Sequence, residues 1–281
     1  MKYKFLLKRK VKMEESFVLI DGSYFIFYRY FAILSWWKHT KKEGPPTVEN
    51  KEFLEKFIKL FNEKLQEIAK KLNIDNPIYI AAKDCSRNDI WRSKLFPPYK
   101  KNRCYDNFEG GPFFALVYAD KLFELAGCKT VLHYPGLEAD DCIAITVNHI
   151  KTSKPNSKIY IIASDADYMQ LNSDNVFIYN LKFKSLVNNK TIFDDPEKSL
   201  FCKIISGDKS DNIPSIIPRC GVKTAIKYYE NKEEFKKMIS ANDKAKTLYE
   251  MNRTLIDFKD IPEHLVNGFR EILFKSLNIY I

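Results

Sequence analysis

The feature that most constrains the fold of this chain is a short apolar run that ends in aspartate. The clearest case is residues 159–163, Ile-Tyr-Ile-Ile-Ala, which are followed by Ser164, Asp165 and Asp167. Short apolar runs rich in β-branched residues are typical of buried strands in a parallel sheet. Open α/β sheets carry their sites just beyond the carboxyl ends of such strands. The run therefore predicts a central strand with two carboxylates at the functional edge of a sheet.

The same arrangement recurs along the chain. Residues 17–20 form an apolar run closed by Asp21, and Asp84 lies just beyond residues 78–82. An isolated Asp-x-Asp is better explained by a polar turn that caps the next helix, but the recurrence favours one shared acidic site. Further strands are predicted at residues 129–133 and 176–179. Apolar periodicity predicts helices over residues 24–37, 49–72, 113–126, 142–150, 200–205 and 224–229, and a basic helical tail over 232–281.

Acidic residues also gather before the helix predicted at residues 142–150. Glu138, Asp140 and Asp141 fall within four positions. A helix dipole stabilises each acid in the first turn by only ~0.3–1 kcal/mol. Three acids this close repel one another and raise one another's pKa. The cluster therefore predicts a cation at this helix start.

Together these acids form one candidate set of oxygen ligands. The set is Asp21, Asp84, Glu138, Asp140, Asp141, Asp165, Asp167, Asp208 and Asp211. Oxygen ligands without histidine or cysteine select hard cations such as Mg²⁺, with Mn²⁺ as a substitute. So many carboxylates imply two ions, and a pair roughly 3.5–4 Å apart is suited to phosphodiester hydrolysis.

Composition narrows the class of protein. The net charge of +10 favours a polyanionic partner, although a lysine-rich composition also follows from an AT-rich genome. No apolar run approaches the ~20 residues that span a bilayer. No signal peptide is evident, so a cytoplasmic protein is expected. The dispersed cysteines and histidines argue against a structural zinc site.

Residues 91–112 interleave cations with aromatic side chains. This pattern suits a single strand, with charges on phosphates and rings on bases, but a solvated charged face is the alternative. A glycine turn before the helix at 224–229 can hold a phosphate through backbone N–H groups. The candidate nucleic-acid-binding residues are Arg29, Arg92, Lys94, Tyr99, Lys100, Lys101, Arg103, Gly221, Lys223 and Thr224.

Five motifs follow one another along the chain. They are Ile-Asp-Gly-Ser at 20–23, Tyr-Lys-Lys-Asn-Arg at 99–103, Leu-Glu-Ala-Asp-Asp at 137–141, Ser-Asp-Ala-Asp-Tyr-Met-Gln-Leu at 164–171 and Gly-Asp-Lys-Ser-Asp-Asn-Ile-Pro at 207–214. In this order they resemble the 5′-nuclease (flap endonuclease-like) superfamily, and most of all its T-even phage ribonuclease H group. The resemblance implies an α/β, PIN-like fold with a mostly parallel sheet flanked by helices. It divides the chain into a basic arm (1–16), a nuclease domain (17–198) with an arch (91–112), and a helical domain (199–281) with a helix-three-turn-helix (207–230).

The resemblance also implies roles for the matched residues. Asp21, Asp84, Glu138, Asp140 and Asp165 would hold one ion. Asp167, Asp208 and Asp211 would surround a second, with Asp141 shared or behind. Lys100 and Arg103 would hold the scissile phosphate, so Lys100, Arg103, Asp140 and Asp165 are the predicted catalytic residues.

The implied activity is that of a metal-dependent 5′-3′ exonuclease and flap endonuclease with ribonuclease H activity, which removes RNA primers in DNA replication. The implied substrates are DNA and RNA·DNA hybrid with 5′ ends or flaps. Implied partners are a single-stranded-DNA-binding protein and a replication clamp, with no membrane, and the protein would be a monomer.

A K⁺ ion is implied at the helix-three-turn-helix. There, however, Ile216 and Arg219 replace two of the family's glycines, which weakens the case for duplex grip and for the ion. Two alternatives stay open, a noncatalytic DNA-binding protein of the same fold and an aspartate-nucleophile phosphatase.

Overall fold

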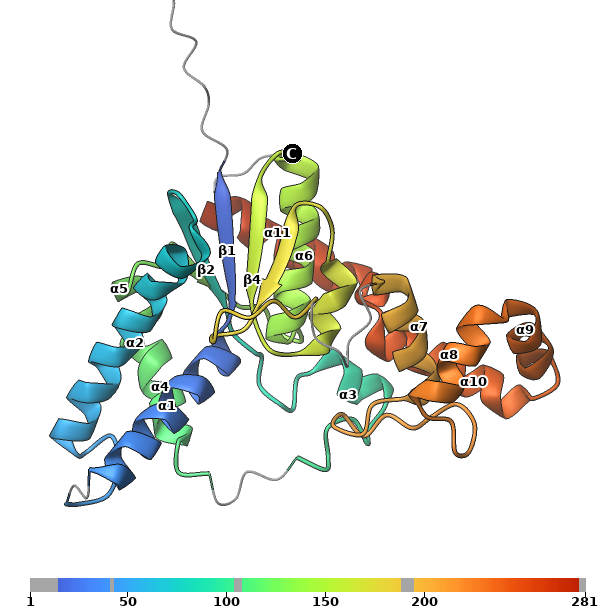
Figure 1. The fold of residues 1–281 in the computed structure, drawn as a ribbon, viewed down its shortest axis with the longest axis horizontal. Coiled ribbons are helices and arrows are strands. Elements are labelled where there is room, and N and C mark those ends of the chain that lie inside the picture. The colour runs from blue at the N-terminus through green and yellow to red at the C-terminus, as the bar shows by residue number, and fades with distance from the viewer. Residues whose placement is uncertain (1–14, 41–42, 104–107, 188–194, 278–281) are drawn as a thin grey trace, which may run out of the picture.

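A five-stranded parallel sheet forms the centre of the protein (Figure 1). The computed structural model describes residues 15–40, 43–103, 108–187 and 195–277, so almost all of the predicted basic arm (1–16) lies outside the described residues. The strand order is β3-β2-β1-β4-β5. The strands are β1 (Ser16–Asp21), β2 (Pro77–Ala82), β3 (Thr130–Leu132), β4 (Lys158–Ile162) and β5 (Val176–Tyr179). The predicted α/β fold with a parallel sheet is confirmed.

The strands are continuous apolar runs because both faces of the sheet are covered. Phe17 and Leu19 of β1 pack into one buried cluster, whereas Val18 and Ile20 pack into the other. Side chains alternate between the faces of a strand, so neither face can be polar. The helices that follow the strands supply the covering side chains on both faces (Figure 1).

Four helices cover one face of the sheet. They are α1 (Gly22–His39), α2 (Lys51–Leu72), α4 (Gly111–Ala119) and α5 (Leu122–Leu125). A single helix was predicted over 113–126, but Lys121 lies in the left-handed region with φ 53° and divides it into α4 and α5. The apolar spacing persists across this break, which explains why the pattern alone predicts one helix.

The other face is covered by α6 (Ala139–Ser153), the short 3₁₀ helix η1 (Ala166–Leu171) and α11 (Glu263–Leu277). The last helix returns to the sheet, because Phe269, Leu273 and Leu277 are buried in the same cluster as Leu19 of β1. A division at 198/199 therefore does not separate two cores, and α11 belongs with the sheet.

The described residues that follow β5, from 195 to 260, form a helical lobe beside the sheet (Figure 1). Its helices are α7 (Pro196–Ser206), α8 (Val222–Glu230), α9 (Lys232–Ser240), α10 (Asp243–Ile256) and the 3₁₀ helix η2 (Phe258–Asp260). A separate small cluster that includes Ile205, Ile216 and Ala225 holds α7 and α8 together. Within the described part of the chain, no helix has the length and apolar character needed to cross a membrane.

Candidate active site

Five carboxylates from four segments line one cavity at the carboxyl edge of the sheet. The cavity has a volume of about 270 Å³. Its carboxylates are Asp21, Asp84, Glu138, Asp140 and Asp165, the five residues predicted to hold one ion. Lys100 and Arg103 also line it, together with Ser23, Phe27 and Tyr168. Residues more than 140 positions apart in the sequence meet here because the ends of β1, β2 and β4 lie side by side.

Hydrogen bonds fix the first two carboxylates. Asp21 ends β1 and caps α1, accepting a bond from the N–H of Tyr24 at 2.9 Å and from the hydroxyl of Tyr168 at 3.0 Å. Asp84 accepts bonds from the Ser23 hydroxyl and, at 2.8 Å, from the N–H of Ala139 in the first turn of α6. Asp84 therefore ties the end of β2 to the starts of α1 and α6.

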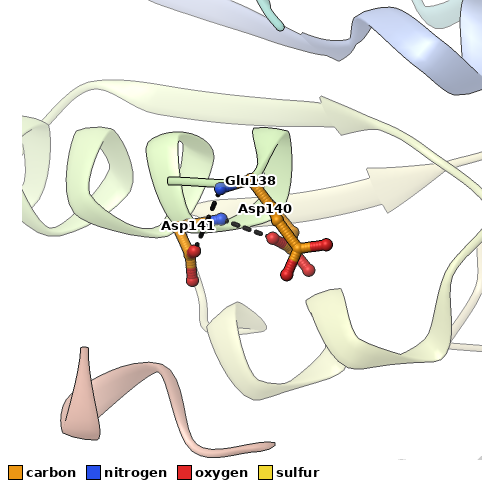
Figure 2. A group of neighbouring side chains, drawn as sticks. All are labelled: Glu138, Asp140 and Asp141. Carbon is orange, nitrogen blue, oxygen red and sulfur yellow. Dashed lines mark hydrogen bonds between the residues drawn. The ribbon is translucent and has the colours of Figure 1, made fainter. Parts of the chain in front are cut away.

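The acids at the start of α6 point in two directions (Figure 2). Glu138 and Asp140 point the same way, and both line the cavity. Asp141 points away and accepts two bonds from the Arg92 guanidinium, at 2.8 and 2.7 Å, and one from the Trp91 indole. The three could share a cation by distance alone. Because Arg92 neutralises Asp141, the geometry favours a place for Asp141 behind the ligands over its sharing a cation with them.

Crowding changes the protonation of these acids. Burial, reinforced by the charge of Asp84, raises the pKa of Asp21 to about 7. Burial and the charges of Asp141 and Glu138 raise the pKa of Asp140 well above its ordinary value. For Glu138, burial is outweighed by Lys100 and Arg92, and its pKa falls. The cavity therefore has an excess of negative charge that a bound cation would relieve.

Lys100 is placed in the cavity by an unusual backbone conformation. Its φ of 54° lies in the left-handed region, which is rare for a residue with a side chain. The conformation is held by a bond from its N–H to the carbonyl oxygen of Asp211, at 2.9 Å. Its ammonium contacts Glu138 at 2.6 Å, and the Arg103 guanidinium pairs with Asp211. Both predicted phosphate-binding cations thus face the acids.

A second acidic group lies next to the first. Asp167, Asp208 and Asp211 can each place an oxygen within 4.8 Å of the others, as expected for the second ion. Lys203 of α7 pairs with Asp167 and, at 2.8 Å, with Asp208. Burial would raise the pKa of Asp208, but the Lys203 ammonium lowers it to about 2. Lys203 is a site residue that the sequence did not reveal, because one lysine in a basic chain carries no distinguishing signal.

Two residues predicted to bind nucleic acid are instead buried, which corrects those assignments. Arg92 is 2% exposed and bridges Glu138 and Asp141. Tyr99 is 4% exposed, and its hydroxyl oxygen lies 3.0 Å from a carboxylate oxygen of Glu138 and 3.2 Å from one of Asp211, so its ring is not free to stack on a base. Both residues help to hold the carboxylates of the acidic cluster in place.

The other predicted nucleic-acid-binding residues have mixed surroundings. Lys94 and Lys101 are exposed near α3 (Trp91–Leu95) and the following turn, in the predicted arch, whose residues 104–107 lie outside the described ones. Arg29 lies half-buried on α1, with its guanidinium 5.7 Å from the Tyr28 ring centroid. It does not line the acidic cavity.

The predicted phosphate-binding turn lies at the start of α8. Gly221 and Lys223 are exposed, and Thr224 is half-buried. Arg219, which stands where the family has a glycine, has a φ of 58° and so adopts the left-handed conformation that favours glycine. Ile216 is buried in the small cluster of the helical lobe. The turn thus accommodates both replacements.

The donors at this site fit hard divalent ions. The residues that line the cavity offer carboxylate and hydroxyl oxygens, and neither histidine nor cysteine is among them. Such donor sets are typical of Mg²⁺ and Mn²⁺. The raised pKa of Asp21 adds an electrostatic reason for a cation.

Comparisons with known proteins point to one family. Residues 16–199 match the family described as 5′-3′ exonuclease, N-terminal resolvase-like domain. The chain is 28% identical over 262 residues to the 5′-3′ exonuclease of Buchnera aphidicola from Acyrthosiphon pisum, covering 86% of this chain and 84% of that protein. It is also 28% identical over 218 residues to the Aquifex aeolicus 5′-3′ exonuclease, covering 75% and 68%.

Solved structures share the fold. Bacteriophage T5 5′-exonuclease with bound zinc ions superimposes with a TM-score of 0.64 at 18% identity, covering 93% of this chain and 99% of that one. A T5 flap endonuclease variant, solved as a pseudo-enzyme–product complex with DNA and metal ions, has a TM-score of 0.63 at 18% identity and the same coverage. Because the matched residues include all five strands of the sheet and all five carboxylates of the cavity, the chain belongs to the 5′-3′ exonuclease family.

Proposed function

We propose that this protein is a divalent-metal-dependent 5′-3′ exonuclease and flap endonuclease. It hydrolyses phosphodiester bonds in DNA and in RNA·DNA hybrids with 5′ ends or flaps, and removes RNA primers during DNA replication. The observation that carries the proposal is the meeting of five carboxylates with Lys100 and Arg103 around one cavity. Membership of the 5′-3′ exonuclease family supports the same reaction.

The acids divide into two sets of ligands. We assign Asp21, Asp84, Glu138, Asp140 and Asp165 to one ion, and Asp167, Asp208 and Asp211 to another, with Mg²⁺ as the ion and Mn²⁺ as a substitute. These residues would hold the two ions, whose chemistry would be to activate water and to stabilise the charge on the leaving oxygen. Arg92 and Asp141 keep Glu138 in place from behind.

Lys100 and Arg103 hold the scissile phosphate. Burial opposes the charge on Lys100, but Glu138, Asp140 and Asp211 outweigh it and raise its pKa, so the ammonium stays protonated. Its contact with Glu138 can be exchanged for a phosphate oxygen once cations occupy the acids. A fixed positive charge beside the phosphate stabilises the charge that develops in the transition state.

The helical lobe grips the duplex. The exposed N-terminus of α8, with Gly221 and Lys223, offers backbone N–H groups and a positive charge to a phosphate. A K⁺ ion at this turn, a single-stranded-DNA-binding protein, a replication clamp and a monomeric state stay predictions from the family resemblance.

The test is cleavage of 5′-labelled flap and RNA·DNA hybrid substrates, with Mg²⁺ and with a chelator. Asp140→Asn and Asp165→Asn should reduce cleavage to background, because each removes a ligand charge. Fluorescence anisotropy without divalent ions should show that both variants still bind the substrate. Parental cleavage should require Mg²⁺ or Mn²⁺.

The matched control is Asp174→Asn. Asp174 is exposed in the turn before β5, at the end of the strands opposite the acidic cavity. Its replacement should therefore leave the cleavage rate unchanged. Parental rates in Asp140→Asn and Asp165→Asn would refute the assignment. Tight binding without cleavage by the parental protein would instead favour the noncatalytic alternative.

A further inference from the structure

A second cavity adjoins the acidic one. It has a volume of about 550 Å³, within the range of roughly 300–1,000 Å³ that is typical of small-ligand sites. Ser23 and Asp84 line both cavities, so the two are neighbours across this pair. Lys83, Phe114 and Tyr118 also line the second one, together with Ala115 and Ala119, and we call it the Lys83–Tyr118 pocket. Lys83, Phe114 and Tyr118 do not line the acidic cavity.

Gly22 makes room for this pocket. A Cβ atom at Gly22 would lie 2.6 Å from the Tyr118 hydroxyl oxygen and 2.5 Å from the carbonyl oxygen of Ala82. The absent side chain therefore lets α4 bring Tyr118 against the start of α1. The Tyr118 hydroxyl oxygen is buried, and no described residue gives it a hydrogen bond of acceptable geometry. A buried hydroxyl without a partner is costly unless a ligand supplies one.

The Tyr118 hydroxyl is a donor at neutral pH, because a phenol is protonated there. A protonated hydroxyl can donate to an anion.

Lys83 supplies a positive charge to the same pocket. Its ammonium lies 4.5 Å from the centroid of the Tyr118 ring, and it forms no ion pair with any carboxylate of the described residues. By contrast Lys100 and Lys203 are both paired with acids. The pocket thus joins an ammonium and a hydroxyl donor to the apolar ring of Phe114, beside the Asp84 carboxylate. These groups match the phosphate and the sugar or base of one nucleotide.

The position of the pocket indicates on which side of the scissile phosphate its nucleotide would lie. Helix α4 lies on the opposite side of the sheet edge from α7, α8 and α10 (Figure 1). If the helical lobe holds the duplex, a strand that passes through the acidic cavity continues toward α4. In a 5′ nuclease that strand is the 5′ segment, so this step rests on the proposed function.

We propose that the Lys83–Tyr118 pocket binds the nucleotide immediately 5′ of the scissile phosphate. The Lys83 ammonium and the Tyr118 hydroxyl contact that nucleotide's own 5′-phosphate, and Phe114 packs against its sugar or base. The pocket thereby positions the leaving segment of the strand.

A double-mutant cycle between protein and substrate tests the contact. The parental cut site in a flap substrate is mapped first, and the phosphodiester one step 5′ of it is replaced by an uncharged methylphosphonate. In single-turnover reactions with Mg²⁺, the replacement should slow the parental protein about tenfold, as expected for one lost charge-assisted contact. Lys83→Gln should slow cleavage of the normal substrate by a similar factor and be insensitive to the methylphosphonate.

Two further variants complete the design. Tyr118→Phe removes only the hydroxyl, so the methylphosphonate should slow this variant less than it slows the parental protein. This variant tests the pocket independently if Lys83→Gln folds poorly. Lys158→Gln, at the amino end of β4 and so at the opposite edge of the sheet, should behave as the parental protein. If the methylphosphonate slows every variant by the parental factor, or slows none including the parent, the pocket assignment is wrong. If the parental protein does not cut the normal substrate at all, the proposed function itself has failed.

Discussion

Lys203 shows how one side chain can balance the charge of two carboxylates. Its ammonium pairs with Asp167 and Asp208, which belong to different segments. Burial would lower the pKa of Lys203, but the two carboxylates and Asp165 raise it, so the charge persists. For Asp167, burial outweighs the lysine and raises the pKa to about 6. Lys203 therefore compensates the negative charge of these carboxylates only in part.

Lys203→Met should destabilise the protein in the presence of a chelator. Removing one partner of a buried ion pair costs about 3–5 kcal/mol, and partial exposure of this group reduces the expected loss to about 1–3 kcal/mol. Urea unfolding measures the change. Lys236→Met, which removes a fully exposed pair with Glu233, is the matched control and should change nothing measurable. Equal stability of the two variants would show that Lys203 does not balance the acids.

Asp21 should give the metal-free protein a distinctive pH dependence. Its pKa in the folded protein is about 7, far above its ordinary value, because burial and Asp84 oppose its charge. The stability this proton confers is complete below the unfolded pKa and is lost as pH rises through 7. Between pH 5 and 8 the parental protein should therefore lose on the order of 2–3 kcal/mol relative to Asp21→Asn.

Urea unfolding of both proteins at pH 5 and pH 8, in a chelator, measures that difference. Saturating Mg²⁺ should reduce it, because the ion takes the place of the proton. Asp174→Asn, with an exposed carboxylate, should run parallel to the parental protein at both pH values. A constant gap between the parental protein and Asp21→Asn would mean that Asp21 is not protonated in the folded state.

At the scale of elements, the carboxyl edge of the sheet was predictable because the apolar runs of β1, β2 and β4 each end at or just before an aspartate. Parallel pairing of β1 with β2 and β4 then brings those acids together. The predictions for Arg92 and Tyr99 went wrong because cations alternating with aromatic rings look the same on a surface and around a buried charge. The spacing of residues in the sequence does not show with which carboxylate an arginine will pair, as Arg92 does with Asp141.

Arg92 links two elements to the acidic cluster and should be important for stability. It bridges Glu138 and Asp141 and donates from Nε to the carbonyl oxygen of Leu255, at the end of α10. Arg92→Met would leave buried carboxylates uncompensated, at an expected cost of about 3–5 kcal/mol in urea unfolding. Arg253→Met, at an exposed pair with Asp260, should cost at most about 1 kcal/mol. Similar losses in the two variants would contradict the role of Arg92.

At the scale of the whole molecule, the arrangement of the C-terminal helices was the least predictable feature. The amphipathic pattern of residues 263–277 predicts that one face is buried, but it does not say against which part of the chain. The structure places that face on the sheet beside α6, the helix that begins with Glu138 and Asp140. The chain therefore leaves the sheet after β5, builds the helical lobe and returns, so that both ends of the lobe are anchored on one core.

Phe269→Ala tests whether α11 is part of that core. Phe269 is fully buried, and its ring meets the Tyr134 ring edge-on with centroids 6.4 Å apart. Deleting a buried phenylalanine ring costs about 3–5 kcal/mol. Because the lost contacts belong to the cluster that holds β1 and α6, the whole sheet should unfold at lower urea. Amide hydrogen exchange in β1 and α6 should accelerate together with exchange in α11. Phe31→Ala, at a ring that is 52% exposed, should leave exchange in all three nearly unchanged. If faster exchange were confined to residues 263–277, the last helix would be an appendage, and the sheet would be stable without it.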